Sequence, residues 1–347
     1  PVHEENITPT APKTTTEKDV NKKTSETKDA ETEKWKTESE VEGTTSPTPK
    51  RYYPKVIKGL WDPGSISADV ENIAELKELG INTINVIIEI NNSYEEVFSD
   101  ALNKERKFGN DAVEKFKDGI EKIKKNGMAV IIIPEYIGEI TENEPTKKFS
   151  SLEVFLQRMK SLAVKWAKIA EELNAEFFSP INEFDQVLKE NGIPEEEILR
   201  REEEFYNQII PEIRKEFSGK IYCKLGSLHK YKDFNAKHCD IVGVIIPLED
   251  PAKGLKGFEE SANAYIQNAV QISKKYNKPW CVAEMFVPKM ASQFTGISLD
   301  EFYKEAINAY KNAEIPGVGF TFMGYFNPFA SIKNTKAEEE IKKFFHQ

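Results

Sequence analysis

Cysteine and histidine are scarce in this chain, which has three cysteines and four histidines among 347 residues. The cysteines, Cys223, Cys239 and Cys281, lack the CxxC spacing of a zinc site, and their odd number does not suggest a disulfide framework. Each falls in a strand-like run, so we expect all three to be small buried apolar side chains. No HExxH pattern or cluster of acidic ligands occurs, so the sequence predicts no metal site and no cofactor.

A long hydrophobic run and an excess of positive charge are also missing. No stretch of about 18 apolar residues occurs, so we expect no membrane-spanning segment. The formal net charge of -10 argues against nucleic acid or an anionic membrane as a partner, because either would need a basic face. A neutral carbohydrate substrate suits this charge better.

The first fifty residues lack apolar runs and contain Trp35 as their only aromatic residue. They are rich in Thr, Lys and Glu, a composition that cannot bury enough apolar surface to offset the entropy of ordering. We interpret residues 1–50 as a disordered stalk or linker. Residues 51–347 are then long enough for one barrel-sized catalytic domain.

The start of the chain and its composition indicate where the protein acts. A first residue Pro1 rather than Met fits either a mature form whose signal peptide has been removed or a fragment. Together with the Thr-rich stalk, it predicts an exported protein that is extracellular or attached to the cell surface through this stalk. Abundant Lys and Glu with few Gln is typical of hyperthermophile proteins and predicts a thermostable chain.

From residue 56 onward, short β-branched runs alternate with longer amphipathic stretches, which is typical of parallel strands joined by helices. The runs predicted as strands are residues 56–61, 83–90, 128–134, a run ending at 183, 220–225, 240–247, 280–286 and 318–325. Helices are predicted at residues 67–79, 111–126, 152–173, 195–217, 262–276, 299–312 and 337–345. This alternation predicts an α/β fold of the (β/α)8 TIM barrel type, in preference to a doubly wound open sheet.

Two glutamates, Glu183 and Glu284, each end an apolar run, the fourth and the seventh of the series. A carboxylate at the tip of a buried strand is costly unless it faces a solvated cavity. The C-terminal ends of barrel strands form the catalytic face, so the two side chains can meet across it. Cleavage of a glycosidic bond needs one carboxyl to protonate the leaving oxygen and another to attack or stabilise the anomeric carbon. The alternative is that both are exposed charges near loops.

The residues around these glutamates resemble a known group of enzymes. Asn182-Glu183 at the end of the fourth strand and Ala283-Glu284 at the end of the seventh resemble the retaining (β/α)8 glycoside hydrolases of the "4/7" superfamily, clan A. The stretch of residues 76–83, LKELGINT, resembles the phrase that enters the second strand in many members.

This resemblance implies a role for each matching residue. Glu183 is the acid/base, Glu284 is the nucleophile, and Asn182 contacts the sugar 2-hydroxyl. It implies double-displacement hydrolysis of a β-linked polysaccharide or oligosaccharide, with β-mannan or β-glucan favoured and galactan also open. No cofactor is required.

The chain departs from the group's pattern in three places. The sixth strand ends Ile245-Ile246-Pro247 and offers no tyrosine, where many members have one that hydrogen-bonds the nucleophile. The eighth ends Met323-Gly324-Tyr325 without the tryptophan of a sugar platform, and the second ends in Asn91 without an arginine. The particular family therefore stays open.

Other residues at strand ends are expected to line a carbohydrate cleft, because sugars present apolar faces to aromatic rings and hydroxyls to polar groups. These expected substrate-binding residues are Trp61, Glu135, Tyr136, Lys224, His229, Phe286 and Tyr325. For each aromatic residue, core packing is an equal alternative, and His229 alternatively lies in a solvated loop.

Two other functions compete with the glycosidase. A barrel that acts on a phosphorylated metabolite is disfavoured, because residues 288–290 and 327–329 do not form glycine-rich anion loops after the last two strands. A non-catalytic carbohydrate-binding or cell-surface barrel is the second. The missing tyrosine favours it, and the presence of both glutamates argues against it.

Overall fold

The computed structural model describes residues 51–347, except residues 65, 101–102, 140–145, 227–232 and 328. The segment 1–50, predicted to be a disordered stalk, lies outside the described residues, and that prediction stays untested. Among the described residues, no helix has both the length and the apolar content that crossing a membrane requires.

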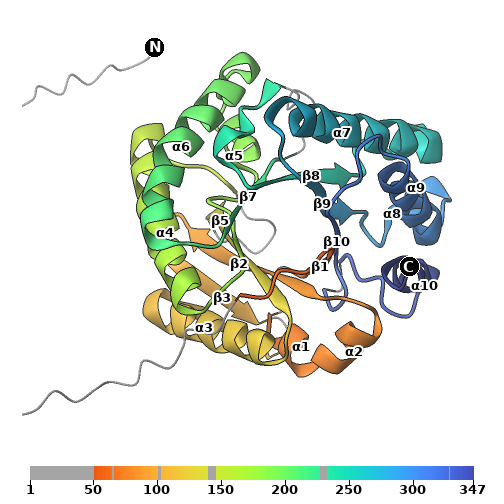
Figure 1. Cartoon of the computed structure of the whole chain (residues 1–347), viewed down its shortest axis with the longest axis horizontal. Coiled ribbons are helices and arrows are strands. Elements are labelled where there is room, and N and C mark those ends of the chain that lie inside the picture. Colours follow the sequence, from red (N-terminus) through yellow and green to blue (C-terminus); the bar gives the residue numbers. More distant parts are fainter. Residues whose placement is uncertain (1–50, 65, 101–102, 140–145, 227–232, 328) are drawn as a thin grey trace, which may run out of the picture. The chain divides into compact units, whose positions relative to one another are not determined.

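Eight parallel strands form a closed barrel (Figure 1). In barrel order they are β1 (Ile57–Trp61), β2 (Thr83–Asn91), β5 (Ala129–Gly138), β6 (Phe177–Phe178), β7 (Lys220–Lys224), β8 (Ile241–Pro247), β9 (Trp280–Phe286) and β10 (Gly319–Met323). Because β1 pairs with both β10 and β2, the ring has no free edge. The (β/α)8 prediction is confirmed.

Helices surround the barrel (Figure 1). They are α1 (Ile66–Glu71), α2 (Ile73–Glu78), α3 (Gly109–Lys125), α4 (Leu152–Glu172), α5 (Phe184–Glu190), α6 (Glu195–Glu216), α7 (Gly254–Tyr276), α8 (Ala291–Thr295), α9 (Leu299–Lys311) and α10 (Lys336–Phe345). The helix predicted at residues 67–79 is two short helices, and α5 and α8 were not predicted. Between β7 and β8 the described residues form the short 3-10 helix η2 (Ala236–His238) and no α-helix.

A β-hairpin that the sequence did not predict extends the sheet beside β2. Its strands, β3 (Glu96–Asp100) and β4 (Glu105–Phe108), are antiparallel, and β3 pairs with Glu89 and Ile90 of β2. The pairing of β2 with β1 ends at Asn85, so β2 continues beyond its neighbour. The hairpin covers the edge that this longer strand would otherwise leave unpaired.

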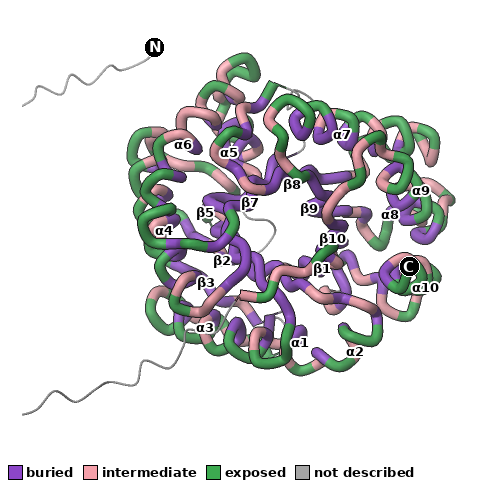
Figure 2. The backbone as a smooth tube through the Cα atoms, viewed as in Figure 1, coloured by how far each residue is buried: buried purple, intermediate pink, exposed green. Residues whose placement is uncertain are grey.

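Two apolar cores support the barrel, one inside the ring and one between the strands and the helices. The outer core is the larger, and the buried faces of the helices point toward it (Figure 2). The inner core is formed by Ile57, Trp61, Ile87, Ala129, Ile131, Ile133, Phe177, Tyr222, Ile241, Cys281 and Ala283. Toward the C-terminal ends of the strands, charged side chains follow these apolar ones on the interior face.

The cysteine prediction is wrong for two of the three residues. Cys223 and Cys239 form a disulfide, and only Cys281, which is buried, is free. Cys223 lies in β7 and Cys239 just before β8, and these neighbouring strands pair at Tyr222 and Ile241. Spacing along the sequence could not predict this pairing, because adjacent barrel strands bring the two residues together.

We predict that the double variant Cys223→Ala/Cys239→Ala is less stable by about 3 kcal/mol, the loss expected when a disulfide closing a loop of this length is removed. The two cysteines are 16 residues apart. Denaturant unfolding of the parent and the variant measures the difference. As a control, alkylation of the denatured parent should modify Cys281 alone until a reductant is added. Modification of all three without a reductant would contradict the disulfide.

Candidate active site

A left-handed turn after β6 presents Glu183. The chain continues to pair with β5 beyond the assigned strand, because the Ser179 and Asn182 amides donate to Ile132 and Pro134 carbonyls at 2.9 and 2.8 Å. Glu183 then has φ 41° and ψ 53° and caps the N-terminus of α5. A non-glycine residue held in this region is strained by about 1 kcal/mol or more, and such strain is concentrated at functional sites.

A β-bulge turns Glu284 into the barrel. Val282 and Glu284 pair with the consecutive residues Val244 and Ile245 of β8, and β10 shows the same extra residue in β9. Strict alternation from Ala283, an inner-core residue, would direct Glu284 toward the helices. The extra residue reverses the alternation, as bulges do beside active sites. Glu284 is buried, with 5% of its surface exposed.

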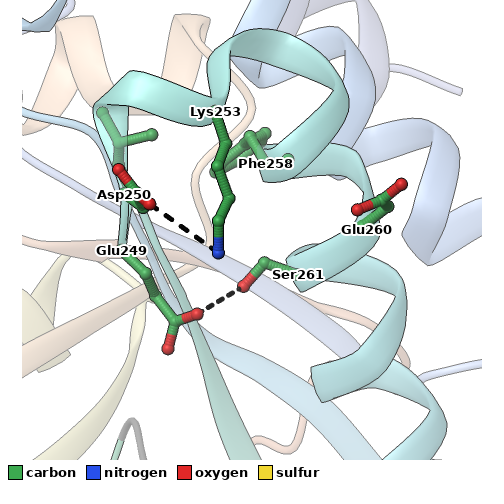
Figure 3. A pocket seen from close by; sticks show the side chains of 8 residues that line it. Glu249, Asp250, Lys253, Phe258, Glu260 and Ser261 are labelled. Carbon is green, nitrogen blue, oxygen red and sulfur yellow. Dashed lines mark hydrogen bonds and ion pairs between the residues drawn. The ribbon is translucent and has the colours of Figure 1, made fainter.

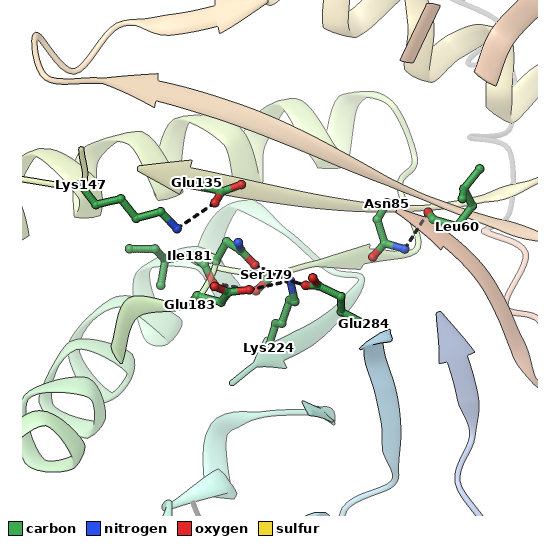
Figure 4. A network of polar contacts seen from close by, with 10 residues as sticks. Leu60, Asn85, Glu135, Lys147, Ser179, Ile181, Glu183, Lys224 and Glu284 are labelled. Carbon is green, nitrogen blue, oxygen red and sulfur yellow. Dashed lines mark hydrogen bonds and ion pairs between the residues drawn. The ribbon is translucent and has the colours of Figure 1, made fainter. Parts of the chain in front are cut away.

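Lys224, the last residue of β7, connects the two carboxylates (Figure 4). Its ammonium group donates to Glu284 Oε2 at 2.6 Å and to Asn182 Oδ1 at 2.8 Å, and it lies 3.5 Å from Glu183 Oε1. It also lies 3.1 Å from the centre of the Trp61 ring. The lysine is fully buried, so these groups replace its entire hydration shell.

A second ion pair lies beside this group. Lys147 Nζ is 3.1 Å from Glu135 Oε1, the Glu135 side chain standing near the end of β5. Lys147 also acts electrostatically on Glu183, and Glu135 acts on Glu284. We call Glu135, Lys147, Glu183, Lys224 and Glu284 the charged cluster.

The two central carboxyls interact directly and have opposite pKa shifts. Burial raises the pKa of Glu284 to about 8, with Lys224 opposing the rise and Glu183 and Glu135 adding to it. Burial would also raise the pKa of Glu183, but Lys224 and Lys147, together with hydrogen bonds that include one with Glu284, lower it below its usual value. Glu183 thus faces two cations, whereas Glu284 faces one cation and two carboxylates. Of the two, Glu284 therefore has the higher pKa.

Most of the polar residues predicted for the site lie in or against the charged cluster. Asn182 contacts Lys224, and Trp61 lies under the same ammonium. Lys147 was not predicted, and no pattern in the sequence distinguishes it from neighbouring lysines. His229 lies outside the described residues, so its predicted role stays untested.

The predicted aromatic residues have different positions. Tyr136 is buried against Phe155 of α4 and donates to the Lys148 carbonyl. Tyr325 is buried, and its hydroxyl lies 2.8 Å from a carboxylate oxygen of Glu75 and 2.8 Å from one of Glu338, with one O–H to donate. Both therefore fit the core-packing alternative, and neither contacts the charged cluster.

Phe286 is half-buried at the end of β9, two residues after Glu284, and stacks on Phe329 with 6.1 Å between ring centres. Phe329 is 54% exposed, which leaves an open aromatic surface. This pair is the aromatic surface nearest in sequence to a carboxyl of the cluster.

Asp62 secures the loop that carries Phe329. Its carboxylate accepts backbone N–H groups of Tyr325, Phe326 and Asn327, the last at 2.9 Å. Burial raises the pKa of Asp62 to about 6 although these hydrogen bonds oppose the rise. The connection after β10 is thereby fixed to the end of β1.

A separate hollow of about 180 Å³ lies where β8 leads into α7 (Figure 3). Around it, Lys253 pairs with Asp250 and Ser261 donates to Glu249. None of its lining residues belongs to the charged cluster. Within the described part of the chain, no group of three or more His, Cys, Asp or Glu is arranged to hold a metal ion.

We predict opposite stability effects for the two neutral variants Glu284→Gln and Glu183→Gln. A pKa raised on folding means that the folded protein binds the Glu284 proton more tightly, so parent stability falls between its ordinary pKa of 4.5 and about pH 8. Glu284→Gln removes this fall and should be more stable than the parent by about 1 kcal/mol or more at roughly pH 9.

Glu183→Gln should instead lose stability above the ordinary glutamate pKa, because Lys224 and Lys147 lose a counter-charge. Denaturant unfolding at about pH 5 and about pH 9 measures both variants. Equal effects of the two substitutions at high pH would contradict the opposite pKa shifts of the two carboxyls.

Solved structures with the same fold include several glycoside hydrolases. A GH113 β-1,4-mannanase matches with a TM-score of 0.59 and 14% sequence identity, over 85% of this chain and 100% of the other. A glycoside hydrolase family 5 mannosidase from Rhizomucor miehei gives 0.61 and 12%, over 84% and 93%. A hyperthermostable endo-1,4-β-D-mannanase from Thermotoga petrophila gives 0.59 and 11%, over 84% and 99%.

No protein family model matches this chain, and no curated protein matches it in sequence. At 11 to 14% identity, the likeness to solved structures shows the fold. The structural neighbours are thus (β/α)8 enzymes of families GH113 and GH5.

Proposed function

We propose that this protein is a retaining glycoside hydrolase that cleaves a β-linked polysaccharide or oligosaccharide. The observation that carries the proposal is the pair of carboxyls Glu183 and Glu284, which meet at the Lys224 ammonium at the C-terminal end of the barrel and have pKa values shifted in opposite directions. Retaining glycosidases need this combination of one carboxylic acid and one carboxylate on opposite sides of the scissile bond.

In the proposed reaction, Glu183 donates its proton to the glycosidic oxygen while a Glu284 carboxylate oxygen bonds to the anomeric carbon. The bond between that carbon and the leaving oxygen breaks with its electron pair on the oxygen. Glu183, now ionised, takes a proton from water, and the resulting hydroxyl replaces Glu284 at the anomeric carbon. The anomeric configuration is retained after these two inversions.

The first step requires an ionised Glu284 and a protonated Glu183. The pKa shifts of the protein without substrate, raised for Glu284 and lowered for Glu183, are opposite to this requirement. We propose that bound substrate reverses this order by changing the charges that each carboxyl faces.

β-Mannan is the substrate we favour, with β-glucan and β-galactan as alternatives. The structural neighbours include proteins described as β-1,4-mannanases, a mannosidase and fungal β-1,4-galactanases. The exposed Phe286–Phe329 stack offers an aromatic surface for the apolar face of a sugar.

We also propose that the protein is exported and thermostable. The Cys223–Cys239 disulfide supports an oxidising compartment, outside the cell or at its surface, and the Thr-rich stalk would separate the barrel from an attachment point. Ion pairs on the helices, such as those of Arg200 with Glu197 and Glu204, support thermal stability because their desolvation costs less at high temperature.

The test is hydrolysis of purified β-mannan, β-glucan and β-galactan by the full chain, with NMR observation of the first product anomer. The proposal predicts hydrolysis of at least one polymer with the β-anomer formed first, since retention preserves the configuration of the cleaved bond. Initial release of the α-anomer would contradict retention. Binding without hydrolysis of any glycan would favour the non-catalytic carbohydrate-binding alternative.

We predict different defects for Glu284→Ala and Glu183→Ala. Glu284→Ala should reduce kcat by about 10⁴-fold or more because the covalent intermediate cannot form, and azide should restore part of the rate on an activated aryl glycoside. Glu183→Ala should retain the first step with a good leaving group and lose the alkaline limb of its pH profile, because no acid remains to be deprotonated. Equal activity of both variants and the parent would show that the pair is not catalytic.

A further inference from the structure

The Lys224 ammonium is the only cation among the described residues for which both central carboxyls are direct partners. A lysine has three N–H donors and no acceptor. Here Lys224 Nζ donates to Glu284 Oε2 at 2.6 Å and to Asn182 Oδ1 at 2.8 Å. Glu183 Oε1, 3.5 Å away, is the acceptor nearest to the third N–H. The whole donor capacity of this buried group is therefore directed at the proposed catalytic residues.

The contact with Lys224 also fixes the orientation of the Asn182 amide. Because Lys224 can only donate, the atom of Asn182 that faces it must be the oxygen. The amino group then points elsewhere, and Asn182 Nδ2 is buried without a hydrogen-bond partner among the described residues. A buried donor without a partner is costly, which indicates that a ligand group completes it.

The neighbouring residues explain why this task falls to Lys224. The end of β8 presents Ile245 and Pro247, so no phenol hydroxyl from that strand reaches Glu284. Tyr222, two residues before Lys224, acts on Glu284 electrostatically, but among the described residues its hydroxyl is hydrogen-bonded to Cys281, whose Sγ donates to it, and not to Glu284. Lys224 therefore supplies the direct hydrogen bond to this carboxylate.

We propose that Lys224 is a positioning residue that aligns Asn182 and Glu284 together, and so holds the Asn182 amino group ready for the sugar 2-hydroxyl contact that the resemblance implies. The inference rests on the proposed function, because it assigns this residue to the same site. One ammonium would then couple substrate recognition to the ionisation of the nucleophile. Both effects should be lost when its charge and donors are removed.

The variant Lys224→Met tests this proposal, since it keeps most of the side-chain length and removes the charge and donors. Measured on paired aryl glycosides with and without the hydroxyl next to the anomeric carbon, the parent should strongly prefer the hydroxylated substrate. Lys224→Met should lose at least about 10-fold of that preference and about 100-fold in kcat, the scale for one lost preorganised donor. A preference equal to that of the parent would overturn the proposal.

A pH profile separates positioning from a general structural defect. Lys224 lowers the pKa of both Glu183 and Glu284, so Lys224→Met should move both limbs of the profile to higher pH. Lys147→Met is the matched control. Lys147 acts on Glu183 and pairs with Glu135, so its removal should move the alkaline limb alone. Identical shifts in the two variants would contradict a special role for Lys224.

Two further measurements keep the inference testable if the parent is inactive or Lys224→Met fails to fold. NMR titration of isotopically labelled glutamate carboxyls, with Glu284→Gln to assign the signal, should show a higher pKa for Glu284 in Lys224→Met without any turnover. Lys224→Gln keeps a donor for Asn182 without the charge, so it should shift that pKa and retain more of the hydroxyl preference. An unchanged Glu284 pKa in both variants would overturn the proposal, whereas an inactive parent with the shift present would contradict only the proposed function.

Discussion

A buried ammonium between carboxyl groups is the interaction on which the site depends. Lys224 has no access to water, so its charge is tolerated only because carboxylates and an amide oxygen surround it. The charged cluster contains the carboxyls of Glu135, Glu183 and Glu284 and the ammonium groups of Lys147 and Lys224. Its charges cancel when the carboxyls together keep one proton. This charge balance suits the proposed reaction, which needs one carboxylic acid and one carboxylate.

The barrel makes this arrangement possible by separating two layers of its interior. Apolar side chains such as Ile131, Phe177 and Tyr222 fill the ring below the cluster, so the charges have a rigid, water-poor floor. The cluster draws its members from the ends of different strands and the connections that follow them. Two local departures from regular structure, the left-handed backbone at Glu183 and the bulge before Glu284, direct the side chains toward Lys224. Both place backbone strain or irregularity where the proposed chemistry occurs.

The regular parts of the fold could be predicted from the sequence because they follow from periodicity. Alternating strand-like runs and amphipathic stretches predicted the barrel, and the placement of Glu183 and Glu284 at strand ends predicted that they would meet. The bulge in β9 could not be predicted, because nothing in residues 280–286 marks an extra residue within the strand. Lys147 could not be found for a different reason: its loop position depends on the packing of distant residues.

The same limit applies to features produced by contacts between neighbouring strands. The Cys223–Cys239 disulfide forms because the register of β7 and β8 brings the two cysteines together. The spacing of cysteines along the sequence gives no information on that register. The β3–β4 hairpin follows from the extra length of β2 relative to β1, a property of the pair and of neither strand alone. Sequence patterns therefore predicted which residues end the strands, and the three-dimensional structure was needed to identify what holds them together.

The most direct measurement for the central claim is covalent trapping of the nucleophile. The full chain is incubated with an activated 2-deoxy-2-fluoro-β-mannoside, whose fluorine slows both formation and hydrolysis of the intermediate and whose good leaving group speeds formation alone, so that the intermediate accumulates. Proteolysis and mass spectrometry then locate the sugar. We predict one sugar on the peptide that contains Glu284, attached through its side-chain carboxyl. A sugar attached to a different carboxylate, or turnover of β-glycans without any trapped intermediate and with inversion, would contradict the account.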